Sequence, residues 1–354
     1  MPKYYHLKVK EVVKETEDVI SIHFWHPWNE LYVYKPGQYL TILWTSPEGE
    51  SIRRSYSLSS SPYTDVTPAI TVKRILNGPV STFLFEHIKE GDTLEVMQAG
   101  GTFYLEPDHD AHRNLFLLGT GSGITPLISI AKTALIAEPD SKVFLLYGNR
   151  RAEDIIFRET LDGLKAKYGD RFHVVYSLTQ PAPDWDGGHG RLTEAKITDL
   201  LNPFLDLVQQ NSSLFFICGQ PLFMEGARNA LLKLGANENA IRHENFYSVP
   251  VVPETEEELN EPLKARTIRL HYEGEVHDLL VQPHQSILEA AMENEIDLPY
   301  SCQAGTCTSC LGRLKKGEVT MDTYDGLTEA EIREGFILNC VAHPLTDDVE
   351  IEVE

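Results

Sequence analysis

Four of the five cysteines in this chain of 354 residues fall near its C-terminal end, and their spacing strongly limits what that part can fold into. Cys302, Cys307 and Cys310 read C-x4-C-x2-C, and Cys340 follows 30 residues later. This spacing is typical of four thiolates that hold a plant-type 2Fe–2S cluster. Gly305 suits the tight loop that must wrap the two irons, since a bulky side chain would push the backbone amides away from the sulfurs. The sequence therefore predicts a one-electron centre at this end.

Two other uses of these cysteines fit less well. Zinc sites more often combine two C-x2-C pairs, which the first spacing here does not provide. Disulfides are characteristic of exported proteins, and the N-terminal residues lack the apolar stretch of a signal peptide. We therefore expect reduced thiols and a cytoplasmic protein.

Charge and composition exclude two classes of partner. The net charge of −22 argues against nucleic-acid binding, and no apolar run is long enough for membrane insertion. Residues 265–354 hold 18 acidic and 6 basic residues. This excess either keeps the segment soluble or attracts a basic partner. Both interpretations stay open.

The first part of the chain, residues 1–107, is predicted to form an antiparallel β-barrel. Short apolar runs alternate there with glycine and proline turns, as in small barrels. The expected strands include Tyr39–Trp44, Ala69–Arg74 and Thr93–Met97.

Residues 108–249 are predicted to form an α/β domain with a parallel sheet, because buried apolar strands alternate with helical segments. The expected strands are Leu115–Leu118, Val143–Tyr147, Phe172–Tyr176 and Leu214–Ile217. The expected helices are Pro126–Ile136, Phe157–Lys167 and Phe223–Leu234.

A linker separates these parts from the cysteine-rich segment. Residues 250–264 are rich in proline and acid and have no periodicity, which indicates an extended tether. Residues 265–354 then predict a small β-grasp domain, with strands at Arg266–Tyr272 and Glu275–Val281 and a helix near Ser286–Asn294. The whole chain is thus expected to be multidomain.

The barrel segment contains a candidate phosphate and heterocycle site. Arg54 can bind a phosphate, the Tyr56 ring can stack on a flat heterocycle, and Ser57 can donate a hydrogen bond to it. Downstream, Ser81 is predicted to cap the helix Phe83–Ile88, whose free N–H groups would suit a phosphate. An ordinary strand with polar exposed residues remains the alternative.

The α/β segment contains a glycine-rich turn, Gly119–Pro126, between a strand and a helix. A dinucleotide pyrophosphate meets a helix N-terminus at this position. Ile124 occupies the place of the third glycine in G-x-G-x-x-G, so a structural turn stays open. Arg150 ends the next strand and would accommodate the 2′-phosphate of NADPH, with NADH as the alternative. Cys218 ends a later strand, either as a buried apolar residue or beside the nicotinamide.

Taken together, these motifs resemble the ferredoxin–NADP reductase family, in particular members fused to a C-terminal plant-type ferredoxin. The resemblance covers essentially the whole chain in order, and it implies FAD, although some fused relatives use FMN. It also implies that Ser57, Cys218, Glu244 and Phe246 surround the site of hydride transfer. The residues expected to contact cofactors are Arg54, Tyr56, Ser57, Leu58, Gly78, Val80, Ser81, Thr82, Gly119, Thr120, Gly121, Ser122, Gly123, Thr125, Arg150 and Gly219.

Within the family, the segments Tyr147–Arg150, Gly317–Met321 and Phe336–Leu338 look like the reductase subunit of the phenylacetyl-CoA epoxygenase complex. This similarity implies a reductase that passes electrons from NAD(P)H through FAD and the cluster to an oxygenase, such as a di-iron monooxygenase. Reductases of Rieske-type and steroid hydroxylases or of hybrid-cluster proteins are the alternative. A redox-sensing module that does not turn over substrate is a second, more remote alternative.

Overall fold

The computed structural model describes residues 4–25, 33–47, 49, 51–75, 78–246, 264–283, 285–303, 305–324 and 326–353. These residues form two compact units, one from Tyr5 to Glu244 and one that begins at Asn245 and includes Tyr4. The expected linker, apart from Lys264, lies outside the described residues. No helix in the described ranges is both long and apolar enough to cross a membrane.

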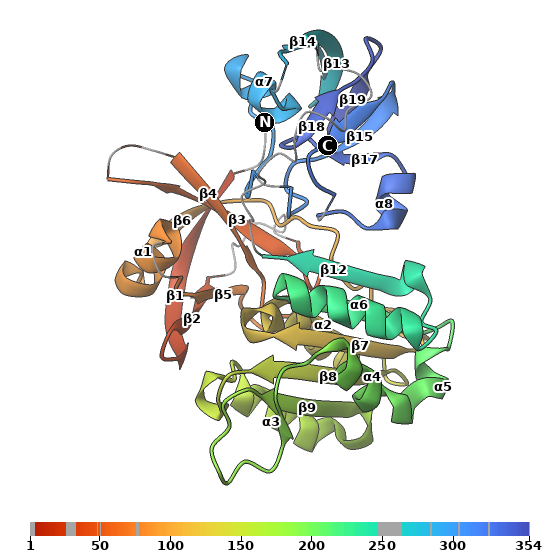
Figure 1. Cartoon of the computed structure of the whole chain (residues 1–354). Helices are drawn as coiled ribbons and strands as arrows, with labels where there is room; N and C mark the ends of the chain where they lie inside the picture. The colour runs from red at the N-terminus through yellow and green to blue at the C-terminus, as the bar shows by residue number, and fades with distance from the viewer. Residues whose placement is uncertain are drawn as a thin grey trace. The chain divides into compact units, whose positions relative to one another are not determined.

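The first half of the larger unit is an antiparallel β-barrel, as predicted. Its six strands follow the order β4-β3-β6-β1-β2-β5, and a bridge between Leu58 and Ile70 joins the two ends of this order. Figure 1 shows these strands in red to orange with α1 beside them. The elements are β1 (Tyr4–Thr16), β2 (Val19–Phe24), β3 (Tyr39–Thr45), β4 (Ser51–Ser57), β5 (Ala69–Lys73), α1 (Pro79–His87) and β6 (Thr93–Met97).

The second half of this unit is the predicted α/β domain. Its strands follow the order β10-β9-β8-β7-β11-β12, and β10 to β11 run parallel. The strands are β7 (Asn114–Thr120), β8 (Lys142–Asn149), β9 (Phe172–Leu178), β10 (Gly188–His189), β11 (Leu214–Gly219) and β12 (Ile241–Asn245). The helices are α2 (Ile124–Ala137), α3 (Arg158–Tyr168), α4 (Glu194–Leu201), α5 (Leu205–Val208) and α6 (Pro221–Lys233).

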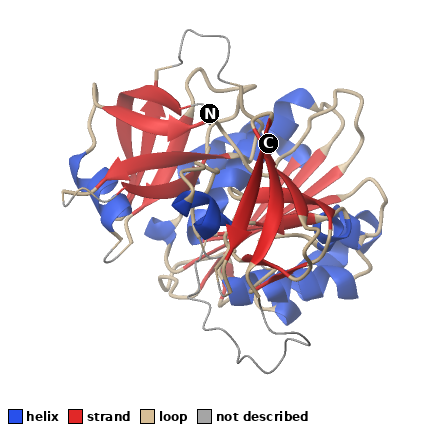
Figure 2. Cartoon of the chain, turned by 90° about the horizontal axis from the view of Figure 1, so that it is seen from above, coloured by secondary structure: helices blue, strands red, loops and turns tan. Residues whose placement is uncertain are grey.

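Helices cover both faces of this parallel sheet, which is why its strands are apolar on both sides. Leu115 and Leu117 of β7 pack in the cluster that contains α2 and α3, whereas Phe116 and Leu118 pack in the cluster with α4 and α6. Figure 2 distinguishes these helices (blue) from the strands (red). Because both faces are buried, apolar residues run continuously along each strand and do not alternate with polar ones.

The carboxyl ends of the central strands meet at one edge of the sheet. Cys218 pairs with Gly119, and Thr120 pairs with Gly148 on the other side. Gly148 pairs in turn with Ser177. Ligands of open parallel sheets bind at this edge, so the register brings the glycine-rich turn and Cys218 together there.

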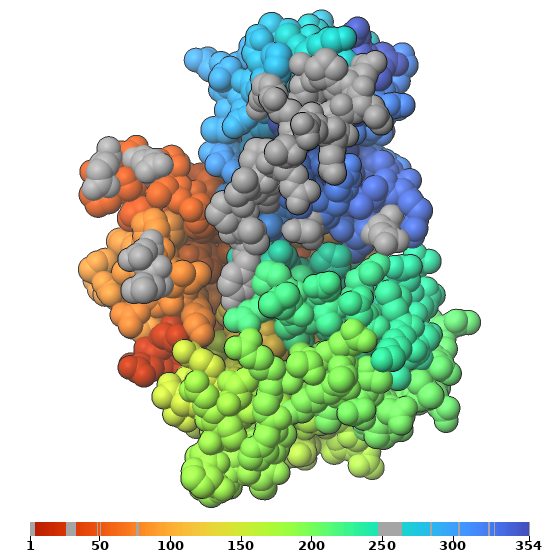
Figure 3. Space-filling view, viewed as in Figure 1, coloured from red at the N-terminus to blue at the C-terminus, as the bar shows by residue number. Residues whose placement is uncertain are grey.

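The second unit is a β-grasp built on a mixed sheet of order β14-β13-β19-β15-β17, with a separate pair of β16 and β18. Helix α7 begins after a capping box of Ser286 and Glu289 and buries Ile287 and Leu288 in the core. Figure 3 shows the surface of this unit in blue. Its elements are β13 (Arg266–Tyr272), β14 (Glu275–Val281), α7 (Ile287–Glu293), β15 (Leu311–Lys316), β16 (Val319–Met321), α8 (Glu329–Arg333), β17 (Phe336–Leu338), β18 (Ala342–Pro344) and β19 (Glu350–Val353).

Candidate active site and cluster site

Strand β4 presents the residues expected to hold a flavin. The side chain of Arg54 is exposed, and its only described partner is the carbonyl of Arg53 at 2.7 Å. Tyr56 is two residues on, and burial raises the pKa of its phenol. A phenol that stays protonated can stack or donate a hydrogen bond without carrying charge. The strand therefore offers an accessible cation and a neutral aromatic ring on alternate positions.

Helix α1 starts earlier than predicted, and the predicted role of Ser81 as its N-cap is wrong. The cap is Gly78, followed by Pro79 in the first turn. Proline fixes a helical φ and needs no N–H partner there, so it starts the helix ahead of Ser81. The Ser81 hydroxyl instead accepts from the Ile75 amide at 3.2 Å and donates to the Gly78 carbonyl at 3.2 Å.

The first turn of α1 still suits an anion. Thr82 donates its amide to the Gly78 carbonyl at 3.0 Å. The amides of Val80 and Ser81 lie in the first turn, where N–H groups have no acceptor within the helix. The amides of Val80 and Ser81 are thus available to bind a phosphate, as expected for this helix start. The amide of Thr82 is not, because it is already bonded within the helix.

The glycine-rich turn fits against the end of β11. A Cβ atom on Gly123 would lie 2.1 Å from the carbonyl oxygen of Cys218, and one on Gly219 would lie 2.2 Å from Oγ1 of Thr120. Gly121 has a positive φ of 54°, which glycine adopts without strain. Close packing therefore requires glycine at Gly123 and Gly219, and the backbone conformation favours it at Gly121. The turn can hold a pyrophosphate at the start of α2.

Three polar side chains from three strands meet beside this turn. The Ser57 hydroxyl of β4 donates to Oε2 of Glu244 of β12 at 3.1 Å. Burial raises the pKa of Glu244 to about 8. Burial raises the thiol pKa of Cys218 on β11, and the charge of Glu244 raises it further. At neutral pH the site therefore holds a protonated carboxyl and a thiol, with no net charge.

Two further predicted residues have clear positions. Phe246 follows β12 and is 38% exposed, so its predicted place over a flavin stays a prediction. Arg150 makes an ion pair with Asp154 at 3.5 Å, and Arg151 makes one with the same carboxylate at 3.3 Å. Both arginines thus lie at the end of β8 with a shared carboxylate. Sequence reasoning gave no signal of this pairing.

The four cysteines near the C-terminus converge, as predicted. Cys302 and Cys307 lie with their sulfurs 3.2 Å apart, and the hydrogen bond between them raises the pKa of Cys307. Cys340 contacts Cys302 and Cys310, and these two thiols raise its pKa. A pocket of mutually contacting thiols is a donor set for iron, which binds them as thiolates. The residues present therefore fit a 2Fe–2S cluster.

Glycines shape the loop around these thiols. Gly305 has a φ of 65°, and a Cβ atom there would lie 2.4 Å from Cγ2 of Thr323. The Gly326 amide donates to the Gly305 carbonyl at 2.8 Å, and a Cβ on Gly326 would lie 3.1 Å from the Cys307 amide nitrogen. The sequence indicated a role for Gly305 but not for Gly326, because the contact of Gly326 with the loop depends on the tertiary fold.

Comparison with known proteins gives the same order of domains. Residues 6–104 match the oxidoreductase FAD-binding domain, residues 117–229 the oxidoreductase NAD-binding domain, and residues 270–345 the 2Fe-2S iron-sulfur cluster binding domain. The chain is thus an NAD(P)H-dependent oxidoreductase with flavin and iron–sulfur domains.

Two characterised relatives span the whole chain. A component of 1,2-phenylacetyl-CoA epoxidase from Escherichia coli (strain K12) is 34% identical and covers 100% of this chain and 99% of its own length. The ferredoxin reductase component of 3-ketosteroid-9-alpha-monooxygenase from Rhodococcus rhodochrous is 37% identical. The match covers 98% of this chain and 96% of that protein. The chain therefore belongs to the ferredoxin reductase family with a C-terminal 2Fe–2S domain.

Solved structures show the same fold. Phthalate dioxygenase reductase matches with a TM-score of 0.58 at 23% identity and covers 99% of this chain and 98% of its own. An intact type IV self-sufficient cytochrome P450 monooxygenase matches with a TM-score of 0.72 at 20% identity, over 99% of this chain and 41% of its own. At these identities the likeness shows the fold alone.

Proposed function

We propose that this chain is the NADPH-dependent reductase of a di-iron monooxygenase, such as a phenylacetyl-CoA epoxygenase, and that it uses FAD. The full-length similarity to the component of the Escherichia coli epoxidase carries this proposal. When bound, FAD accepts two electrons as a hydride, and a 2Fe–2S cluster passes them on singly. The proposed domain boundaries are 1–107, 108–249 and 265–354, with the tether at 250–264.

The residues around the proposed flavin site would orient the reactants and manage a proton. Arg54, Tyr56 and the start of α1 would hold the flavin, and Gly119–Pro126 would hold the pyrophosphate of NADPH. Glu244 carries a proton on its carboxyl at neutral pH, because burial raises its pKa to about 8. The hydrogen bond between Oε2 of Glu244 and Oγ of Ser57 provides a path for that proton.

The preference for NADPH rests on Arg150 at the end of β8. Arg150 is 58% exposed and shares the Asp154 carboxylate with Arg151. Arg151 also lies 3.4 Å from Glu153, so the two carboxylates balance the two guanidinium groups. Among the described residues, Arg150 itself forms an ion pair with Asp154 alone, and its exposed guanidinium can still donate to a 2′-phosphate. Substitution Arg150→Ala should then lower kcat/KM for NADPH more than for NADH, and equal losses would favour NADH.

A steroid hydroxylase or another Rieske-type oxygenase is the second candidate acceptor. The 37% identity to the ketosteroid monooxygenase component favours it. Purified oxygenases of both types separate the candidates: the true partner should stimulate NADPH consumption and be reduced at low reductase concentration.

The substitution Cys307→Ser tests the route of the electrons. It removes one of the four thiols, so delivery to cytochrome c, a one-electron protein acceptor, should be lost. Reduction of ferricyanide, a small acceptor that takes electrons from the flavin directly, should persist. Loss of both activities would contradict a separate flavin site, and retention of both would contradict the route through Cys307.

A further inference from the structure

We propose that Arg242 is a positioning residue that holds β12 in the place where Glu244 meets Ser57. It does so by binding the segment Phe103–Glu106, which joins the barrel to the α/β domain. This inference rests on the proposed function, since Glu244 is placed at the hydride-transfer site. It concerns a residue that neither the motifs nor the family match singles out.

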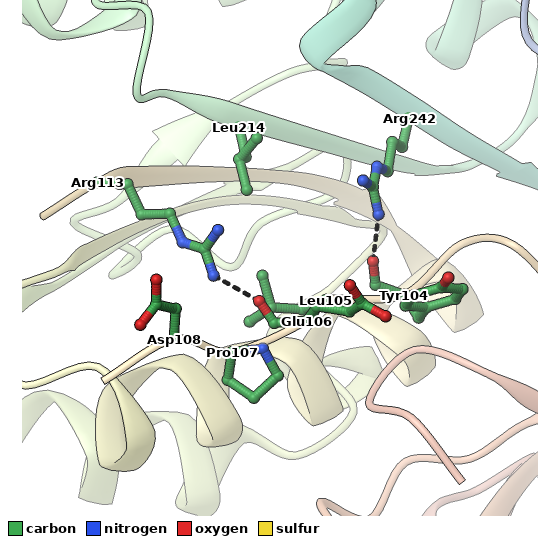
Figure 4. Close-up of a pocket in the computed structure, with 8 residues that line it drawn as sticks. All are labelled: Tyr104, Leu105, Glu106, Pro107, Asp108, Arg113, Leu214 and Arg242. Atoms are coloured by element: carbon green, nitrogen blue, oxygen red, sulfur yellow. Dashed lines mark hydrogen bonds between the residues drawn. The ribbon is translucent and has the colours of Figure 1, made fainter. Parts of the chain in front are cut away.

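Arg242 makes a specific set of contacts across this junction. Its Nη1 atom donates to the carbonyl oxygen of Tyr104. Its guanidinium carbon lies 5.9 Å from the centroid of the Tyr104 ring and 5.7 Å from that of Phe216. Figure 4 shows the side chain pointing from β12 to that carbonyl. Among the described residues no carboxylate forms an ion pair with it. Its charge serves this contact and the two rings, and together with Lys35, the larger influence, it lowers the pKa of Glu106.

The segment that Arg242 binds is fixed to the barrel. The Leu105 amide donates to the Pro36 carbonyl at 3.0 Å. The backbone packs so closely that a Cβ atom on Gly37 would lie 2.4 Å from the Phe103 carbonyl oxygen. On its other side, the Phe103 ring meets Phe216 of β11 in the α/β domain edge-on at 5.4 Å. The Tyr104 carbonyl is therefore a firm anchor, and a contact to it transmits the barrel position to β12.

Arg242 and Glu244 share one face of β12, because side chains two residues apart in a strand point the same way. The neighbouring strand β11 has the same spacing. Phe216 lies against Arg242, and Cys218 lies close enough to Glu244 for the carboxylate, after burial, to raise the pKa of the thiol. A displacement of Arg242 would thus carry Glu244 with it. The carboxyl would move relative to Ser57, which belongs to the barrel.

Strand β12 needs such a restraint because it lies at the edge of its sheet, beside β11 only. Arg242 of this strand lines a pocket of about 470 Å³ together with Tyr104, Leu105 and Glu106 of the junction segment. Arg113 crosses the other side of this pocket and donates to the Glu106 carbonyl. Arg113, however, forms an ion pair with the buried Glu138 and does not belong to β12. Arg242 therefore ties β12 directly to this segment near the active site.

The test compares Arg242→Met with Lys35→Met in the full-length protein. Met keeps the length of the side chain but loses the charge and the hydrogen bond. Lys35 is the matched control, since its Nζ lies 4.1 Å from the centroid of the same Tyr104 ring and 2.6 Å from Glu106, and neither of these contacts of the described residues involves β12. Two properties are measured: amide hydrogen exchange of Ile241–Asn245, and the rate of NADPH-dependent flavin reduction in single turnovers.

For Arg242→Met we expect faster exchange in β12 and a rate roughly ten- to a hundredfold lower, the effect of a small misplacement. KM for NADPH should not change, and Lys35→Met should behave like the wild type. A rate equal to the wild type, or equal losses in both variants, would overturn the inference. If Arg242→Met does not fold, Arg242→Gln, which stays polar but loses the charge and the length to reach the Tyr104 carbonyl, takes its place with the same criteria. A wild type that does not oxidise NADPH would instead refute the proposed function.

Discussion

The Ser57 hydroxyl donates a 3.1 Å hydrogen bond to the Glu244 carboxyl, across 187 residues of sequence. It joins the last residue of β4 in the barrel to β12 in the α/β domain. The pair lies next to the buried thiol of Cys218. Because burial raises the pKa of Glu244 to about 8, its carboxyl is mostly protonated at neutral pH. The barrel and the α/β domain thus share one proton-bearing contact at the proposed site of hydride transfer.

We first predict that flavin reduction by NADPH depends on the ionisation of Glu244. The proton is present below a pH of about 8 and is lost above it, so the rate should fall as pH rises through that value. Substitution Glu244→Gln should give a slower rate that does not change over this range. Stopped-flow absorbance across the pH range provides the measurement. A wild-type rate independent of pH would contradict the role of Glu244.

The substitution Ser57→Ala provides a second prediction, a shift of the pH profile of flavin reduction. The Ser57 hydrogen bond lowers the pKa of Glu244 against the larger effect of burial. Its removal should therefore move the inflection of the pH profile to higher pH. An inflection that stays in place would mean that the titrating group is not Glu244.

The same ionisation predicts how stability changes with pH. The folded-state pKa of Glu244 lies above the ordinary value of 4.5, so its contribution is full at pH values below 4.5 and is lost as pH rises through about 8. The Tm of the wild type should then fall relative to that of Glu244→Gln as pH rises from 4.5 to about 8, and the difference should change no further above that. Thermal unfolding of both proteins at several pH values measures this difference, and parallel curves would contradict it.

The fourth prediction concerns the cysteine loop. Gly305→Ala introduces a Cβ atom 2.4 Å from Thr323, whereas Gly274→Ala introduces one with nothing within 4 Å. Both glycines have a positive φ, so the two variants share the backbone strain. The extra clash should cost roughly 1–3 kcal/mol in the free energy of unfolding and lower the iron content. Denaturant unfolding and iron analysis measure both effects, and equal behaviour of the two variants would refute the packing argument.

The fifth prediction concerns the glycine-rich turn. A Cβ atom on Gly123 would clash with the Cys218 carbonyl, while one on Gly163 in α3 would meet nothing within 4 Å. Gly123→Ala should push the turn away from β11 and raise KM for NADPH. Gly163→Ala should leave KM unchanged and stabilise α3 by about 1 kcal/mol. Steady-state kinetics of both variants decides, and an unchanged KM for Gly123→Ala would contradict the assigned site.

Local patterns predicted much of this fold. Strand β6 has the predicted bounds, and β3, β5, α2, α3 and α6 lie within two residues of theirs. Apolar runs and helical periodicity are properties of short segments, so the sequence contains them directly. The cysteine spacing likewise predicted that the thiols lie close together, because three of the four cysteines fall within nine residues of sequence.

Contacts between distant segments could not be predicted in this way. The family resemblance brought Ser57 and Glu244 to one site, but no local pattern indicated their hydrogen bond or the burial that raises the Glu244 pKa. The start of α1 was placed wrongly because a capping serine and a first-turn proline compete, and the proline prevailed. The anchoring of Arg242 on Tyr104 depends on the junction of the two domains, which leaves no periodic signal.

An anaerobic titration of the purified protein with NADPH, followed by visible absorbance, tests the central claim most directly. The oxidised protein should show flavin bands and the broad absorbance of a 2Fe–2S cluster, and NADPH should bleach both. Bleaching of the flavin bands alone would contradict electron transfer to the cluster within this chain. A protein that binds neither group, or that neither NADPH nor NADH bleaches, would contradict the reductase account altogether.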